Sequence, residues 1–149
     1  MKTKKKINTM KQVLGFSIMV LLLAIVIGCS KDDDPNFSIS AETQTYTVNG
    51  INNCYTPKGA GTAFVFEIPY SSETNSAINK LQIKTTVSDG DSDVDVITTF
   101  TDEDGIIGWY VCFRFGSQDW AEFEVVLETE DGSKSNPTKV RVNKPSGAN

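Results

Sequence analysis

The sequence predicts an all-β protein, an antiparallel two-sheet sandwich of about seven strands. Apolar and polar residues alternate along most of the chain, as in strands with one face buried and one in water. Hairpin-forming Asn-Gly and Asp-Gly pairs separate these runs. No stretch after residue 30 keeps a helical period over two turns. The length of 149 residues allows one domain.

The first 28 residues differ from the rest and predict a secretory signal peptide. A lysine-rich start without acidic residues precedes an uncharged apolar run from Val13 to Ile27. A transmembrane helix needs about 20 apolar residues, so this run is short for a span. A short anchor that stays uncleaved is the alternative.

The signal ends in Val26-Ile27-Gly28-Cys29, which resembles the lipobox of bacterial lipoproteins. The resemblance implies cleavage before Cys29, a diacylglyceryl thioether on its sulfur, and acylation (as by palmitate) of its new amino group. Two or more acyl chains give stable membrane anchoring. The following Ser-Lys-Asp-Asp-Asp run resembles the start of mature lipoproteins of the Bacteroidetes type, which implies an outer-membrane, surface-exposed location. Residues 29–36 are also expected to act as a solvated acidic tether.

Composition excludes several classes of site. The chain has no histidine, which removes His-based triads, zinc-hydrolase sites and His-ligated haem. Without residues 1–28 the chain keeps nine basic and nineteen acidic residues, a net charge of −10. Nucleic acid is therefore not an expected partner, because phosphate binding needs a basic surface.

Residues 37–145 are predicted to form the sandwich, and residues 146–149 a flexible tail. Earlier strand material lies near 37–40 and 44–48, and the later strands are marked by alternating apolar sets: Phe64, Phe66, Ile68 and Tyr70; Leu81, Ile83, Thr85 and Val87; Val94, Val96, Thr98 and Phe100; Ile107, Trp109, Val111, Phe113 and Phe115; Ala121, Phe123, Val125 and Leu127; Val140 and Val142.

The last two of these runs, joined through Asp131-Gly132, resemble the final hairpin of immunoglobulin-like or fibronectin-III-like modules of bacterial surface proteins. The resemblance is close over roughly the last 30 residues and loose over the whole domain. It implies an immunoglobulin-like sandwich, and it implies no activity, because one fold hosts many functions.

Cys54 and Cys112 are candidates for a disulfide, since exported proteins usually oxidise a pair of thiols. Their spacing suits the inter-sheet bridge of immunoglobulin domains, and Tyr110-Val111-Cys112 matches the tyrosine corner. The alternation, however, puts Cys112 on the face opposite Trp109. A bridge that pins a loop over residues 50–61 onto an outer sheet face is therefore expected rather than one through the core. A catalytic cysteine would need a base, and the usual histidine is missing.

Asp89, Asp91, Asp93 and Asp95 have the alternate spacing that begins a calcium loop. The later positions fail, because Val94 stands in place of the loop glycine and Phe100 in place of the bidentate glutamate. If the chain turns back, the cluster at residues 102–104 could share a weakly bound Ca²⁺ with them. The alternative is two solvated turns.

The expected function is that of a non-catalytic, membrane-tethered binding or accessory module for a glycan or a protein. Tyr110 and Trp120 are the candidate ligand contacts, because exposed aromatic rings stack on sugars or anchor protein partners. Trp120 could instead cover the open end of the sandwich. A structural subunit or adhesin of an envelope complex, weakly stabilised by calcium, is the alternative function.

Cys29→Ala removes the only sulfur that the lipobox offers for lipidation. Because the acyl chains supply the anchor, the variant should move from the membrane fraction to the soluble fraction, measured by fractionation and immunoblotting. A variant that stays membrane-bound would show that the lipoprotein interpretation is wrong.

Overall fold

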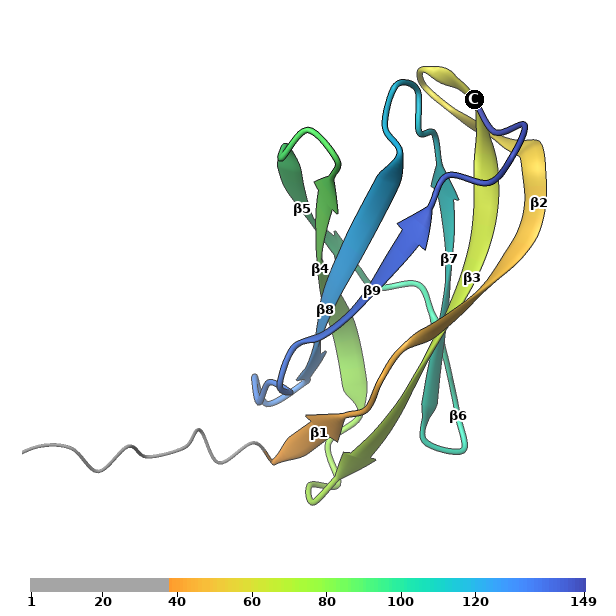
Figure 1. Cartoon of the computed structure of the whole chain (residues 1–149). Coiled ribbons are helices and arrows are strands. Elements are labelled where there is room, and N and C mark those ends of the chain that lie inside the picture. Colours follow the sequence, from red (N-terminus) through yellow and green to blue (C-terminus); the bar gives the residue numbers. More distant parts are fainter. Residues whose placement is uncertain (1–37) are drawn as a thin grey trace, which may run out of the picture. The chain divides into compact units, whose positions relative to one another are not determined.

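A computed structural model describes residues 38–149, which form nine strands in two facing sheets (Figure 1). The signal peptide, Cys29 and the tether lie outside the described residues. Within residues 38–149 no helix is long and apolar enough to cross a membrane. The strands are β1 (Ile39–Ala41), β2 (Thr45–Thr56), β3 (Gly59–Ser72), β4 (Ile78–Val87), β5 (Ser92–Ile97), β6 (Thr101–Glu103), β7 (Ile106–Phe113), β8 (Trp120–Thr129) and β9 (Thr138–Asn143).

All strand pairs are antiparallel. One sheet has the order β1-β3-β7-β6, and β2 continues along the same edge of β3 as β1; the other has the order β5-β4-β8-β9. Four hairpins, β2–β3, β4–β5, β6–β7 and β8–β9, each stay within one sheet, and the chain crosses to the other sheet after β3, β5 and β7. Two facing antiparallel sheets connected in this way are consistent with an immunoglobulin-like sandwich, which confirms the predicted fold class. The strand number exceeds the expected seven because the early strand material forms two separate strands, β1 and β2, and because the three-residue strand β6 was not among the predicted runs.

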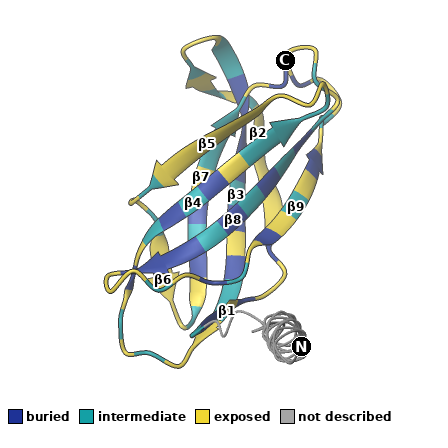
Figure 2. Ribbon diagram, turned by 90° about the vertical axis from the view of Figure 1, so that its left-hand side faces the viewer, coloured by how far each residue is buried: buried dark blue, intermediate teal, exposed yellow. Residues whose placement is uncertain are grey.

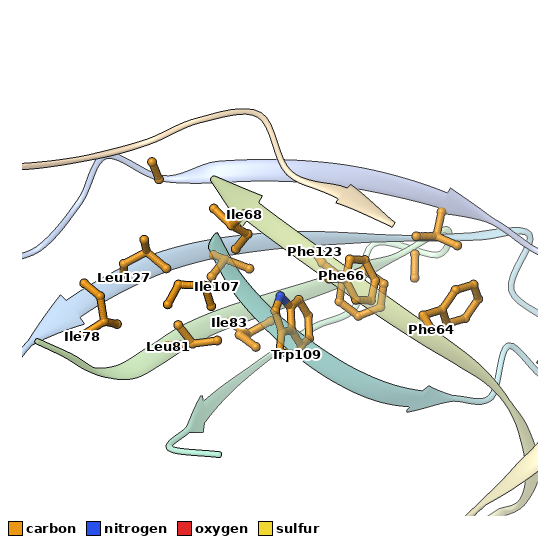
Figure 3. Packing of buried hydrophobic residues seen from close by; sticks show 14 of the residues in the cluster. Phe64, Phe66, Ile68, Ile78, Leu81, Ile83, Ile107, Trp109, Phe123 and Leu127 are labelled. Carbon is orange, nitrogen blue, oxygen red and sulfur yellow. The ribbon is translucent and has the colours of Figure 1, made fainter. Parts of the chain in front are cut away.

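The alternation in β3, β7 and β8 gives the core (Figure 3). Phe66 of β3 stacks on Trp109 of β7 with ring centroids 4.4 Å apart, and both contact Phe123 from the opposite sheet, at 5.0 and 6.0 Å. All three side chains are at most 3% exposed. Large aromatic side chains contribute most of the apolar area buried in such cores, so these contacts hold the sheets together.

The expected orientation of β5 is wrong. Val94 and Val96 were expected inside, but they are 63% and 59% exposed. Asp95 lies opposite Ile83 of β4, a core residue, so the aspartates of β5 occupy the inward face. Figure 2 shows β5 almost wholly exposed beside the more buried β4. Both faces of this edge strand are exposed from Ser92 to Val96, so the alternation of valines and aspartates does not by itself determine which set points inward.

A disulfide joins Cys54 of β2 to Cys112 of β7, with Cα atoms 5.8 Å apart. The bridge lies within one sheet, on the face opposite Trp109, as the alternation predicted. The expected loop at 50–61 is instead a bulged hairpin of β2 and β3. Gly61 lies beneath the bridge, where an added Cβ would come within 3.0 Å of the Cys112 sulfur.

The last residues, which were expected to form a flexible tail, are hydrogen-bonded to the domain. The Asn149 carbonyl accepts a hydrogen bond from the Phe115 amide at 2.9 Å. Asn52 of β2 donates to the Gly147 carbonyl at 2.8 Å and accepts from the Asn149 amide at 3.1 Å. These bonds tie the end of the chain to both β2 and the β7–β8 connection.

Asp131 organises the β8–β9 turn. Its carboxylate accepts hydrogen bonds from the Thr129 hydroxyl (2.6 Å), the Ser133 amide (3.0 Å) and the Ser76 hydroxyl (2.8 Å). These donors, the Thr129 hydroxyl first, hold the pKa of Asp131 well below its ordinary value of 3.8.

Replacing both bridged cysteines, in Cys54→Ala plus Cys112→Ala, should lower the free energy of unfolding by about 4 kcal/mol, since the bridge restricts the unfolded chain. Urea unfolding of the oxidised proteins measures this. Dithiothreitol should destabilise the parent protein to the same degree and leave the double variant unchanged. Equal urea midpoints under oxidising conditions would contradict the assignment of the bridge.

Asp131→Asn should unfold at a lower temperature than the parent protein at neutral pH. A carboxyl whose folded-state pKa is depressed stabilises the fold above its unfolded value of 3.8 and loses this effect as the pH falls below it. The parent protein should therefore lose stability on acidification more steeply than the variant, measured by thermal unfolding between pH about 5 and 3. Glu130→Gln is the matched control, because the Glu130 side chain makes no hydrogen bond or ion pair within residues 38–149.

Candidate binding groove

A groove of about 530 Å³ opens between the two sheets on the side where β5 lies across from β7. Strands of both sheets contribute to it, so it forms where the sandwich is left unclosed at one side. The residues around it are Thr85, Val87, Asp91, Ser92, Asp93, Asp95, Val111, Cys112, Phe113 and Phe123.

The groove exists because β6 is short. β6 pairs with β7 only from Ile106 to Gly108. The outward edge of β7 from Trp109 to Phe113 therefore has no strand partner within residues 38–149, although its other edge is fully paired with β3. A free edge carries unpaired backbone N–H and C=O groups that can accept another strand.

One wall of the groove is acidic. Asp91, Asp93 and Asp95 face it from β5 and the residue before β5. All four ion pairs among residues 38–149 use glutamates of β8, so none of these aspartates has a cationic side-chain partner in that part of the chain. The groove thus presents uncompensated negative charge.

The floor of the groove is apolar. Phe123 is a core residue, 2% exposed, and Val87, Val111 and Phe113 pack against the core while remaining partly accessible. The hydrophobic core therefore reaches the surface in this groove. A ligand that fits it needs an apolar surface and a positive charge.

The predicted calcium arrangement does not form. Asp89 is not among the groove residues, and its carboxylate accepts hydrogen bonds from Gln118 and from the Asp91 amide, which lower its pKa. The Asp102 cluster lies at the other end of the sandwich, near the β6–β7 turn, where Asp102 accepts a hydrogen bond from the Tyr70 hydroxyl at 3.0 Å (Figure 1). Within residues 38–149 no three carboxylates or thiols are arranged to hold a metal ion.

Tyr110 and Trp120 do not form a joint ligand platform. Tyr110, 53% exposed, lies on the outer face of the β3–β7 sheet, whereas Trp120 lies on the outer face of the β8–β9 sheet. Trp120 is half-buried beneath Arg141, whose guanidinium carbon is 4.0 Å from the ring centroid, and Arg141 also pairs with Glu122 at 3.3 Å. A sugar could not contact both rings at once.

Sequence reasoning found the aspartates but not the groove. Their alternate spacing already puts three carboxylates on one face of a strand. Alternation does not show which face of a strand points inward. The short length of β6, which leaves part of the β7 edge unpaired, could not be predicted from any sequence pattern.

No protein-family model matches the chain, and no curated protein matches it. A solved structure described as the X-ray structure of Northeast Structural Genomics Consortium target SoR45 is similar at a TM-score of 0.45 and 12% identity. The match covers 74% of this chain and 89% of that one. At this degree of similarity it says nothing about function.

Proposed function

We propose that this protein is a non-catalytic lipoprotein of the outer membrane that displays an immunoglobulin-like domain on the cell surface and binds a protein ligand in the β5–β7 groove. The observation that carries the proposal is the unpaired edge of β7 at the rim of a groove with an apolar floor. Free strand edges of this kind bind extended segments of other proteins by main-chain hydrogen bonds.

A protein ligand is favoured over a glycan. Sugar recognition by stacking needs exposed aromatic rings on one surface, and Tyr110 and Trp120 lie on opposite faces of the sandwich. A strand edge offers repeated amide and carbonyl groups, which match a polypeptide backbone.

The anchoring part of the proposal rests on the lipobox at Cys29 and the acidic residues after it. The arrangement of the domain suits display: the described chain enters at β1, and the β4–β5 turn beside the groove lies at the opposite end of the sandwich (Figure 1). A ligand approaching that turn meets the end of the domain farthest from where the chain enters.

The absence of catalysis is part of the proposal. The sequence holds no histidine, and both cysteines of the domain are joined in the disulfide. The groove therefore lacks the thiol and imidazole groups on which many nucleophilic mechanisms depend. Its aspartates are exposed, without the enclosed pocket that acid–base glycosidases use to tune a carboxyl group.

A photo-crosslinking residue placed at Ser92, on the groove rim, should give a discrete protein adduct when intact cells are irradiated. The same residue at Glu67, exposed on the outer face of the β3–β7 sheet, is the matched control and should give none. The adducts are read by immunoblotting and mass spectrometry. A carbohydrate adduct, or equal adducts at both positions, would overturn the proposal.

A further inference from the structure

We propose that the ligand of the β5–β7 groove is an extended protein segment with lysine or arginine at alternate positions, which adds to β7 as an extra strand. This inference rests on the proposed function and names the chemistry of its partner. The juxtaposition behind it is a free strand edge, an apolar floor and a row of unpaired aspartates in one groove.

The free edge determines where the backbone of the ligand binds. A strand added beside Trp109–Phe113 lies about 4.8 Å from β7 and takes up its unpaired amides and carbonyls. It continues the line of β6, which pairs with β7 only up to Gly108. Alternate side chains of this added strand then point outward beside Tyr110 or inward to the groove.

The spacing of the aspartates sets the sequence pattern of the ligand. Residues of one strand that share a face repeat every 6.6 Å or so, and Asp91, Asp93 and Asp95 follow this alternation. An extended ligand has the same repeat, so each of its inward side chains lies opposite one carboxylate.

The floor selects long cationic side chains over short ones. An inward side chain crosses Val111 and Phe113 before it reaches the β5 wall. Lysine and arginine have an apolar stem and a charged end, so the stem covers the floor while the charge pairs with an aspartate. No lysine or arginine within residues 38–149 makes an ion pair with these aspartates, so the ligand has no internal cation to displace.

The long edge of β2 is a poorer site for strand addition. Its pairing with β3 shifts register on both sides of Gly50, and Asn52 has a positive φ of 54°. Asn52 is also bonded to the C-terminal residues. Bulges and covering segments of this kind protect an edge from added strands.

The test uses the full-length protein, purified from membranes in a non-ionic detergent, and a synthetic blocked peptide of four Lys-Thr repeats. Calorimetric titration should show binding that weakens as salt is added. Asp93→Asn plus Asp95→Asn should raise the Kd about tenfold. Glu67→Gln plus Glu103→Gln removes the same charge from exposed positions on the opposite face of the β3–β7 sheet and should leave the Kd unchanged.

A second peptide of equal charge, N-methylated at alternate residues so that it cannot complete the strand hydrogen bonds, should bind at least about tenfold more weakly. Equal binding of both peptides would mean that charge alone attracts them, and it would overturn the proposal that the ligand adds to β7 as a strand. Absence of binding by the Lys-Thr peptide, while the crosslink at Ser92 still forms, would refute the cationic ligand and leave the protein-binding function intact. Self-association of the Asp93→Asn plus Asp95→Asn variant with unchanged peptide affinity would show that the aspartates only protect the edge of β5.

Discussion

The contacts among Phe66, Trp109 and Phe123 are the interaction on which the rest of the domain depends. They join β3 and β7 of one sheet to β8 of the other, with centroid distances between 4.4 and 6.0 Å. Each strand that carries these rings is one of the two interior strands of its sheet. The outer strands are added around this centre, and they differ in how completely they cover it.

The two sides of the sandwich are closed to different degrees. On the β2–β9 side, Gln44 is 2% exposed and its amide donates to the Phe123 carbonyl at 2.6 Å and to the Thr138 carbonyl at 3.2 Å. The two bonds of its amide nitrogen join β8 and β9 to the segment before β2, while its Oε1 has no hydrogen-bond partner within residues 38–149. On the β5–β7 side no comparable link appears among the described residues, and the short β6 leaves the core accessible through the groove. The groove is thus a consequence of covering one side of the core and not the other.

Much of this fold was predictable from period-2 alternation, because residues such as Phe64 in β3 and Leu127 in β8 belong to alternating sets that bury one face of their strand. The alternation also placed Cys112 on the outer face, against the expectation from its spacing to Cys54. It failed at β5, where valines and aspartates alternate and both faces are exposed, so hydrophobicity alone gave the wrong orientation. It also missed the bonds of Asn149, because contacts of Asn52 and Phe115 with the end of the chain depend on tertiary structure.

The disulfide matters for the groove as well as for stability. Cys112 is among the groove residues and lies in the part of β7 whose outward edge is free. That strand is held by its pairing with β3 on one side and by the bridge to Cys54 across Gly61. An edge fixed in this way is already extended, so the proposed strand addition would not have to order it, and ordering is one of the main costs of binding. An outer-face bridge therefore supports the proposed binding edge in a way that an inter-sheet bridge through the core would not, because it acts on the strand that presents the unpaired backbone groups.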